Sequence, residues 1–250
     1  MVERQDVAEG VRILRLNKPP ANAIDEALLL MLSRELDAAA ADAAVRAVVL
    51  TGSGRCFCAG FDFAAPRRDD QVAVDLYEIY REAHLKLLSL PKPTIAMVNG
   101  HLIAGGVVLA LACDYRLGLD GDYRVGMNEV SVGASFPRAA LEIVRLRLSS
   151  SRAAEMILGA SLYPARQALR LELVDELLPV ETLEATVLRR AARFGAYPRE
   201  AYAHAKSGLI EQAVARIRAE SVEESIAAMT VWISDESRAA RRRQRERLGL

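Results

Sequence analysis

The sequence has little of several residue types that would point to a particular partner. Its 250 residues carry 33 basic and 33 acidic side chains, so the formal net charge is zero and no basic excess indicates nucleic acid. Lysine is scarce, and arginine supplies most of the positive charge. With 52% hydrophobic and 26% charged residues, the composition is typical of a soluble globular protein with one large domain, or one domain and an appendage.

Cysteine occurs only at Cys56, Cys58 and Cys113. Cys56 and Cys58 are too close in sequence for an easy disulfide and the count is odd, so we expect the chain to be cytoplasmic, in a reducing compartment. Two cysteines one residue apart could begin a metal site, but neither a CxxC partner nor a nearby histidine completes one. We therefore expect no metal.

No uninterrupted hydrophobic run is long enough for a membrane span. The longest apolar stretch covers residues 94–113 and is interrupted by Asn99, Gly100 and His101, whereas a span needs about 20 apolar residues. The first ten residues, MVERQDVAEG, place charges where a signal peptide needs an apolar core. The stretch is better interpreted as a buried strand, a turn and a buried helix, and we expect no membrane partner.

Several familiar catalytic motifs are also missing. The sequence has no GxSxG, no GxxxxGKS or GxxxxGKT, and no GxGxxG after a strand. Its three histidines, His84, His101 and His204, are far apart and form no HExxH, so a histidine-based triad has little support. His101 follows a predicted strand and is interpreted either as a turn residue or as a residue that lines a pocket.

Strands and helices alternate along the first two thirds of the chain. Short runs such as VRILRLN, RAVVLTG and PTIAMVN are typical of strands. Helical spacing covers residues 71–90, 139–148, 152–158 and 165–171. From about Glu181 onward the pattern is only helical. This order predicts an α/β protein with a core over residues 1–190 and a helical region over residues 191–250.

Two glycine-containing stretches follow predicted strands. Gly60 lies in CFCAGFDF, and Gly105 and Gly106 begin a predicted helix in HLIAGGVVLALACD. Glycine lets backbone N–H groups approach a ligand closely, and a helix start has N–H groups without intrahelical acceptors. Two such stretches that face each other would form an oxyanion hole. Tight packing of a strand against a helix also explains Gly-Gly, so both interpretations stay open.

A single acidic residue, Glu129, lies in the otherwise mild stretch RVGMNEVSVG. It is interpreted either as an exposed turn residue or as a base that points into a pocket. The structure around it decides between the two. The basic tail RAARRRQRERLGL is interpreted as a solvated helix with oligomer contacts, or as a segment near phosphates.

Taken together, FCAGFDF, PKPTIAMVNGHLIAGGVVLALACDYRL and GMNEVSVG resemble the crotonase (enoyl-CoA hydratase/isomerase) superfamily in order and spacing. The opening ILRLNKPPANAID and the later YPARQALRLELVDELLP are also similar, so the resemblance covers essentially the whole chain. It implies a crotonase-like spiral core of repeated ββα units and a C-terminal helical trimerisation region, which builds a homotrimer or a hexamer. The implied partner is an acyl-CoA or enoyl-CoA substrate, and no cofactor is implied.

The resemblance also implies a site, position by position. Phe61, after the glycine of the AGxD motif, and Gly105, at the glycine-rich helix start, correspond to the two backbone N–H donors of an oxyanion hole. The implied substrate-binding positions are Ala59, Phe61, Asp62, Phe63, Ala64 and Gly105. Members of the family often have lysine at the position of Ala64, so one phosphate contact is not accounted for here.

The number of acids favours one branch of the family. The resemblance implies that the hydratases of this family use two glutamates for the reaction. The corresponding positions in this sequence hold Val108 and Glu129. The stretches AGG, CDYR and GMNE and the last helices resemble the mitochondrial-type Δ3,Δ2-enoyl-CoA isomerases, in which Glu129 would be the single acid/base. Apolar neighbours such as Val108, Val130 and Val132 would raise its pKa towards the range that suits a base.

Two alternatives stay open. Hydration or thioester hydrolysis would follow if a side chain such as Ser135 or His101 held the water that a second glutamate would otherwise hold. The protein would instead be a non-catalytic acyl-CoA binding protein if the site were idle, although the presence of Glu129 argues against this.

Overall fold

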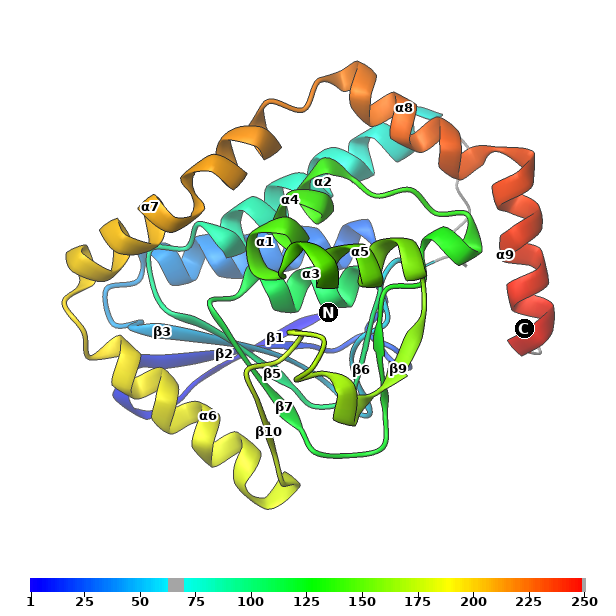
Figure 1. Cartoon of the computed structure of the whole chain (residues 1–250). Coiled ribbons are helices and arrows are strands. Elements are labelled where there is room, and N and C mark those ends of the chain that lie inside the picture. The colour runs from blue at the N-terminus through cyan, green and yellow to red at the C-terminus, as the bar shows by residue number, and fades with distance from the viewer. Residues whose placement is uncertain (63–69, 249–250) are drawn as a thin grey trace.

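The computed structural model describes residues 1–62 and 70–248 of the chain. A six-stranded sheet forms its centre, with the strand order β1-β2-β3-β5-β7-β10 (Figure 1). The strands are β1 (Val2–Asp6), β2 (Val11–Leu16), β3 (Ala47–Gly52), β5 (Thr94–Val98), β7 (Tyr115–Leu119) and β10 (Glu176–Leu178). β1 is antiparallel to β2, and the other neighbours are parallel. The predicted α/β class is confirmed.

A second sheet has four short strands. In order across the sheet they are β4 (Cys56–Cys58), β6 (His101–Ile103), β8 (Arg124–Gly126) and β9 (Leu162–Pro164). β4, β6 and β8 directly follow β3, β5 and β7, and they pair with one another in parallel. Helices α2 (Asp70–Leu88) and α3 (Gly105–Ala112) come after the first two of these strand pairs. The chain therefore repeats a strand–strand–helix unit, which confirms the predicted ββα core.

Helices cover both faces of the six-stranded sheet. One face carries α1 (Glu26–Ala41), α2, α3 and α4 (Arg138–Arg147), and the other carries α6 (Val180–Gly195) (Figure 1). The remaining elements of the core are α5 (Ser150–Gly159) and the short helices η1 (Ala8–Gly10), η2 (Val130–Val132) and η3 (Ala165–Gln167). All six residues of β3 are buried, as expected for a parallel strand covered on both faces.

Local sequence explains how the first long helix begins. The side chain of Asp25 accepts a hydrogen bond from the backbone N–H of Leu28 at 2.8 Å, which satisfies one of the unpaired N–H groups at the start of α1. Leu28, Leu32 and Leu36 recur every four residues and are at most 2% exposed, so they form the face of α1 that packs on the core.

The apolar stretch 94–113 forms β5, β6 and α3, which confirms its interpretation as buried strand and buried helix rather than a membrane span. All eight residues of α3 are buried. None of the helices in the described residues combines the length and hydrophobicity needed to cross a membrane.

The chain ends in three outer helices, α7 (Arg199–Arg218), α8 (Val222–Ile233) and α9 (Asp235–Leu248), which run along the outside of the core (Figure 1). The predicted helical C-terminal region is therefore present. The boundary expected at residue 190 falls inside α6, and the outer helices begin after this helix ends.

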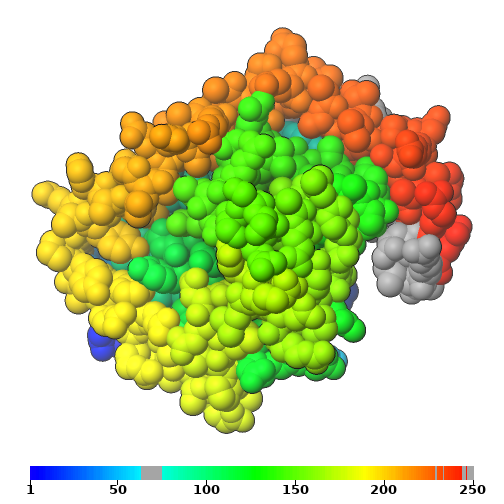
Figure 2. Space-filling model, viewed as in Figure 1, coloured from blue at the N-terminus to red at the C-terminus, as the bar shows by residue number. Residues whose placement is uncertain are grey.

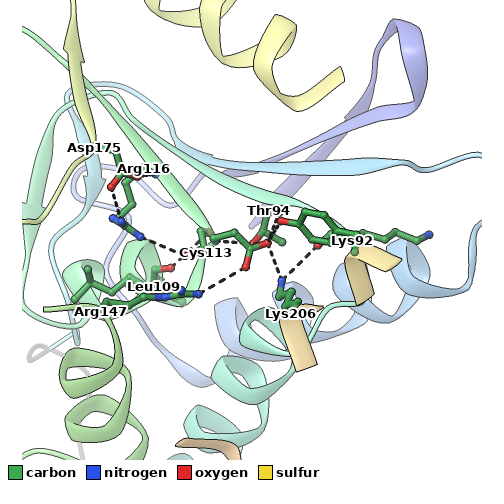
Figure 3. Close-up of polar contacts among 11 residues, drawn as sticks. Lys92, Thr94, Leu109, Cys113, Arg116, Arg147, Asp175 and Lys206 are labelled. Atoms are coloured by element: carbon green, nitrogen blue, oxygen red, sulfur yellow. Dashed lines mark hydrogen bonds and ion pairs between the residues drawn. The ribbon is translucent and has the colours of Figure 1, made fainter. Parts of the chain in front are cut away.

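A buried polar cluster attaches α7 to the core (Figure 3). Lys206 of α7 is 6% exposed, and its Nζ lies 2.9 Å from Asp114 Oδ2 and 3.3 Å from the carbonyl oxygen of Lys92. The Tyr202 hydroxyl and the Thr94 backbone N–H each donate to the same carboxylate at 2.9 Å. Burial lowers the pKa of Lys206, and the charge of Asp114 opposes this shift. This cluster holds α7 against the core, and α8 and α9 come after α7 in the chain.

Candidate active site

The loop at Gly60 and the start of α3 lie against each other. Gly60 has a φ of +81°, and a Cβ there would lie 2.6 Å from the Cβ of Ala104 and 3.0 Å from the backbone nitrogen of Gly105. A side chain does not fit this space, and a φ in this range favours glycine. The two glycine-containing stretches of the sequence therefore meet directly.

The two glycines of α3 have different surroundings. A Cβ on Gly106 would lie 2.2 Å from the carbonyl oxygen of Cys58, so Gly106 is required by tight packing. A Cβ on Gly105 would meet only the end of the Ile24 side chain at 3.0 Å and the Cα of Gly60 at 3.6 Å. As the first residue of α3, Gly105 has an N–H group that no intrahelical carbonyl accepts. This N–H lies beside the Gly60 loop.

Backbone pairing fixes the position of Phe61. Phe61 forms a parallel bridge with Ile24. The N–H of Ile24 donates to the Gly60 carbonyl at 2.7 Å, and the N–H of Asp62 donates to the Ile24 carbonyl at 2.8 Å. The structure therefore brings together the two positions, Phe61 and Gly105, that the sequence implies for an oxyanion hole.

The remaining implied substrate-binding positions lie around this loop. The N–H of Ala59 donates to a backbone carbonyl of the loop before α1 at 3.0 Å. The carboxylate of Asp62 lies 2.8 Å from Lys18 Nζ, which also pairs with the N-cap residue of α1. Asp62 thus ties the loop to the start of α1. Phe63 and Ala64 lie outside the described residues.

Glu129 is buried, which excludes its interpretation as an exposed turn residue. It is 8% exposed and immediately precedes η2. Burial raises the pKa of Glu129 to about 7, and hydrogen bonds from the backbone N–H groups of Glu129 and Asn128 oppose this shift. Within the described residues, its Oε2 has no hydrogen-bond partner. A carboxylate in this state is suited to accept a proton from a bound molecule.

The apolar surroundings of Glu129 differ in part from the prediction. Of the three valines that the sequence predicts as its apolar neighbours, Val108 and Val132 are buried, at 1% and 6% exposed. Val130 is 48% exposed, so unlike the other two valines it is not a buried neighbour of the kind that was predicted. Successive residues of a 3₁₀-helix point about 120° apart, and η2 therefore buries Val132 while it turns Val130 outward.

An aromatic cluster lies beside the loop and Glu129. Phe61 stacks on Tyr80 of α2 with ring centroids 5.2 Å apart, and it meets Trp232 of α8 edge-on at 5.7 Å. Burial raises the pKa of Tyr80, and the charge of Glu129 adds to the effect, which places the phenol near this carboxylate. On its other side Tyr80 stacks on the buried His84 at 3.8 Å, and burial lowers the pKa of His84 to about 4.

Sequence reasoning did not identify Tyr80 or Trp232. The spacing along α2 places Tyr77, Tyr80 and His84 on one helical face. This spacing is the feature of the sequence that could have indicated that Tyr80 is a packed aromatic residue. No local pattern relates Trp232 to residues 61 or 129, because the contact joins segments far apart in the chain.

The two side chains considered as holders of a water both have protein partners. The Ser135 hydroxyl donates to the carbonyl oxygen of Ala228 in α8 and lies 3.4 Å from the Tyr77 hydroxyl. His101 Nδ1 accepts a hydrogen bond from the backbone N–H of Arg124 at 3.2 Å. These contacts bind both side chains to neighbouring elements and lend no support to a second water-activating group.

Comparison with known proteins matches this arrangement to one family. Residues 6–246 match the enoyl-CoA hydratase/isomerase family. The chain belongs to this family. It is therefore an enzyme of the crotonase type, and the resemblance of its motifs is confirmed.

Relatives by sequence have hydratase names. A protein of Thermus thermophilus, whose name assigns it provisionally to the enoyl-CoA hydratases, is 39% identical over an alignment of 178 positions that covers 68% of this chain and 68% of that protein. The 2,3-dehydroadipyl-CoA hydratase of Escherichia coli is 31% identical over 210 residues, which is 84% of this chain and 80% of that protein.

Among solved structures, the human mitochondrial Δ3,Δ2-enoyl-CoA isomerase has a TM-score of 0.93 at 25% identity, and the alignment covers 99% of this chain and 98% of the human one. An enoyl-CoA isomerase of Mycobacterium tuberculosis has a TM-score of 0.81 at 31% identity, with 91% of this chain and 97% of that chain covered. The family thus includes relatives named for two different reactions.

Proposed function

We propose that the protein is a Δ3,Δ2-enoyl-CoA isomerase, which moves a cis or trans double bond of an enoyl-CoA from C3 to the trans-2 position. The observation that carries the proposal is the buried carboxyl group of Glu129, combined with a buried aliphatic side chain, Val108, at the position that corresponds to the second hydratase glutamate. Adding water requires one group to activate it and a proton to be delivered. A double-bond shift moves one proton, and one carboxylate can carry it.

In the proposed reaction, the carboxylate of Glu129 removes a proton from C2 of a 3-enoyl-CoA. The electron pair of that C–H bond moves towards the thioester carbonyl, and the enolate oxygen accepts hydrogen bonds from the backbone N–H groups of Phe61 and Gly105. Glu129 then returns the proton to C4, so that the double bond lies between C2 and C3. No atom is gained or lost, and the chain needs no cofactor for this step.

The pKa of Glu129 supports the role. A group that both accepts and returns a proton works best with a pKa near the pH at which it operates. Burial raises the pKa of Glu129 to about 7, so near neutral pH both forms are populated. Apolar surroundings disfavour the charged carboxylate and therefore make it a stronger base. This increased basicity helps it to remove a proton from the carbon next to a thioester.

The relatives divide between two candidate reactions. The human mitochondrial isomerase, which covers almost the whole chain, favours the isomerase. The hydratase names of the Thermus and Escherichia relatives favour an enoyl-CoA hydratase as the second candidate. The absence of a carboxyl group at Val108 weighs towards the first.

The deciding experiment measures both reactions on one preparation. A 3-enoyl-CoA is followed for conjugated 2-enoyl-CoA, and a 2-enoyl-CoA of the same length is followed for 3-hydroxyacyl-CoA. We expect isomerisation to be faster than hydration by at least about 10²-fold, the lower value of general acid–base assistance. Hydration at an equal or higher rate would move the protein to the hydratase branch.

Replacement of the base provides the matched variant. Glu129→Gln keeps the size of the side chain and removes its basicity, so turnover should fall by about 10²–10⁴. Affinity for a CoA ester should be largely retained. Near-normal turnover of this variant would reject Glu129 as the acid/base.

We also propose that the protein acts in the cytoplasm as a homotrimer or a hexamer built through its outer helices. Val222 and Ile226 lie one turn apart on α8 and are 54% and 47% exposed, which is consistent with an apolar contact on this helix. Light scattering should give three or six times the chain mass of 27.3 kDa. A monomeric mass at micromolar concentration would contradict this assembly.

A further inference from the structure

The loop that carries Glu129 is held on one side by its own backbone. The carbonyl oxygen of Glu129 accepts hydrogen bonds from the N–H groups of Val132 at 3.1 Å and Ala134 at 2.8 Å. Gly133, between them, has a φ of +68°, which favours glycine. These bonds are local: they set the shape of the loop but not its distance from the rest of the site.

The other side of the loop is covered by the C-terminal helices of the same chain. A Cβ on Gly133 would lie 2.5 Å from the Cα of Ser237, so the loop touches α9 directly. Trp232 of α8 forms a buried cluster with Val132 and Ala134. Figure 2 shows α8 and α9, coloured orange-red to red, along the edge of the molecule beside the green part of the chain to which the loop belongs.

Arg241 of α9 connects α8, α9 and the loop. Its Nη2 donates to the carbonyl oxygen of Trp232 at 2.7 Å, and its Nη1 donates to the carbonyl oxygen of Gly133 at 3.3 Å. The guanidinium also lies over the Trp232 ring, 5.5 Å from its centroid. Trp232 is in the last turn of α8, where a carbonyl lacks an intrahelical donor. The planar guanidinium, with its donors in a fixed fork, satisfies both carbonyls at once.

We propose that Arg241 is a positioning residue for Glu129. It fixes the loop 129–135 against α8 and α9, and in this way sets the distance of the carboxylate from the substrate. The inference rests on the proposed role of Glu129 as the acid/base. Arg241 contacts no reacting atom in this scheme and acts through the backbone of Gly133 and Trp232.

The same contact reaches the oxyanion side of the site. The Trp232 ring, held by Arg241, meets the ring of Phe61 edge-on, and the backbone N–H of Phe61 is one of the two proposed donors. One guanidinium thus links the base and the oxyanion loop. A relative displacement of these two parts by about 1 Å can cost about 10²-fold in rate, because proton transfer requires a near-attack geometry.

The experiment compares Arg241→Gln with wild type for kcat, KM and the pH dependence of kcat on a 3-enoyl-CoA. We expect kcat to fall by about 10- to 100-fold with KM changed by less than about threefold, since substrate binding is not the step affected. The acid limb of the kcat profile should move to lower pH, because a loosened loop admits water to the Glu129 carboxylate and stabilises its charge.

Two further variants separate positioning from general stability. Arg241→Lys keeps the charge but not the fork, so its kcat should lie between those of wild type and Arg241→Gln. Arg243→Gln changes an exposed arginine on the same helix and should match wild type in kcat and in pH profile. Circular dichroism and thermal unfolding establish that each variant is folded. If Arg241→Gln does not fold, Arg241→Lys provides the same comparison.

The inference is overturned if Arg241→Gln, folded, keeps the wild-type kcat and pH profile, if its loss lies only in KM, or if Arg243→Gln loses as much. Its failure can be told apart from failure of the proposed function. A wild-type protein that does not isomerise any 3-enoyl-CoA refutes the isomerase. The pKa of Glu129, followed by NMR of carboxyl-labelled glutamate, then tests the positioning: it should still fall in Arg241→Gln, and an unchanged pKa rejects it.

Discussion

At the residue scale, the burial of Glu129 affects the stability of the protein as well as the proposed role of this residue in catalysis. Its pKa is raised from 4.5 to about 7 because the charged form is desolvated in the folded protein. The folded state therefore holds this proton more tightly than the unfolded state does. The resulting contribution to stability is fully present below pH 4.5 and is lost as the pH rises through about 7.

Glu129→Gln should accordingly stabilise the protein at alkaline pH relative to wild type, while it lowers turnover. The variant carries no charge to desolvate, so its stability relative to wild type should increase between pH 5 and pH 8 by about 2–3 kcal/mol. Chemical denaturation at several pH values measures this. Glu184→Gln, at an exposed position on α6, serves as the control and should follow wild type throughout. A difference between Glu129→Gln and wild type that does not vary with pH would show that the carboxylate is not desolvated.

The sequence predicted some site residues and not others, for a physical reason. Phe61, Gly105 and Glu129 lie in short motifs whose spacing carries the information, and the structure buries Glu129 and brings Phe61 to Gly105. Tyr80 and Trp232 complete the surroundings of Phe61 only through packing between distant segments. Helical spacing on α2 indicates that Tyr80 shares a face with Tyr77 and His84, but nothing in local spacing indicates its contact with Phe61, the position of Trp232 or the outward turn of Val130.

The two glycines of α3 offer a matched pair of substitutions. Gly106→Ala should destabilise the fold, because its Cβ would lie 2.2 Å from the carbonyl oxygen of Cys58, which is backbone and cannot move cheaply. Gly105→Ala meets only the flexible end of the Ile24 side chain at 3.0 Å and should remain folded. If the N–H of Gly105 serves the thioester oxygen, kcat of Gly105→Ala should nevertheless fall. Thermal unfolding and kinetics separate the two effects, and similar melting temperatures for both variants would contradict the packing argument.

At the scale of elements, hydrophobic spacing predicted most helices and strands but was wrong at residues 165–171. This segment was predicted to be a helix, and it contains only the short η3. Ala165, Ala168 and Leu171 are buried at intervals of three, a period that suits a 3₁₀ turn better than an α-helix. Strand β1 was not predicted, because a single buried residue and four exposed polar ones at a sheet edge give no apolar pattern.

The attachment of α7 through Lys206 should dominate the stability of the outer helices. Lys206→Met removes the buried ammonium group from the Asp114 carboxylate, which is 10% exposed and keeps Arg147 Nη2 at 3.6 Å as a second partner. Breaking a buried pair typically costs about 3–5 kcal/mol, and the remaining arginine should keep the loss near the lower value. Lys86→Met breaks an exposed ion pair with Asp37 and should cost less than about 1 kcal/mol. Denaturant unfolding measures both, and the double variant Lys206→Met with Asp114→Asn should recover part of the loss. Equal costs for the two single variants would show that the cluster contributes little.

At the scale of the whole molecule, the fold does not determine the reaction. Relatives named as hydratases and as isomerases match this chain over most of its length. The TM-score of 0.93 to one isomerase therefore shows a shared scaffold and does not by itself show a shared reaction. The scaffold places Gly105 beside the Gly60 loop, where the two proposed backbone donors lie, and it buries Glu129. In the proposed function, the addition of water depends on the residue at one further position on α3, which here is Val108.

Val108→Glu tests this separation of scaffold and chemistry. A glutamate at this position would supply the second carboxyl group that hydration needs, so the ratio of hydration to isomerisation should rise, by up to about 10²-fold if general acid–base assistance is fully restored. The new side chain replaces one that is 1% exposed, so the variant should also be less stable. Val108→Gln has the same size and polarity without the acid and is the matched control. Both activities are measured with chain-matched 3-enoyl and 2-enoyl substrates. If Val108→Glu remains folded and its ratio of hydration to isomerisation equals that of Val108→Gln, the number of carboxyl groups does not decide the reaction. Another residue would then have to decide between hydration and isomerisation in this family.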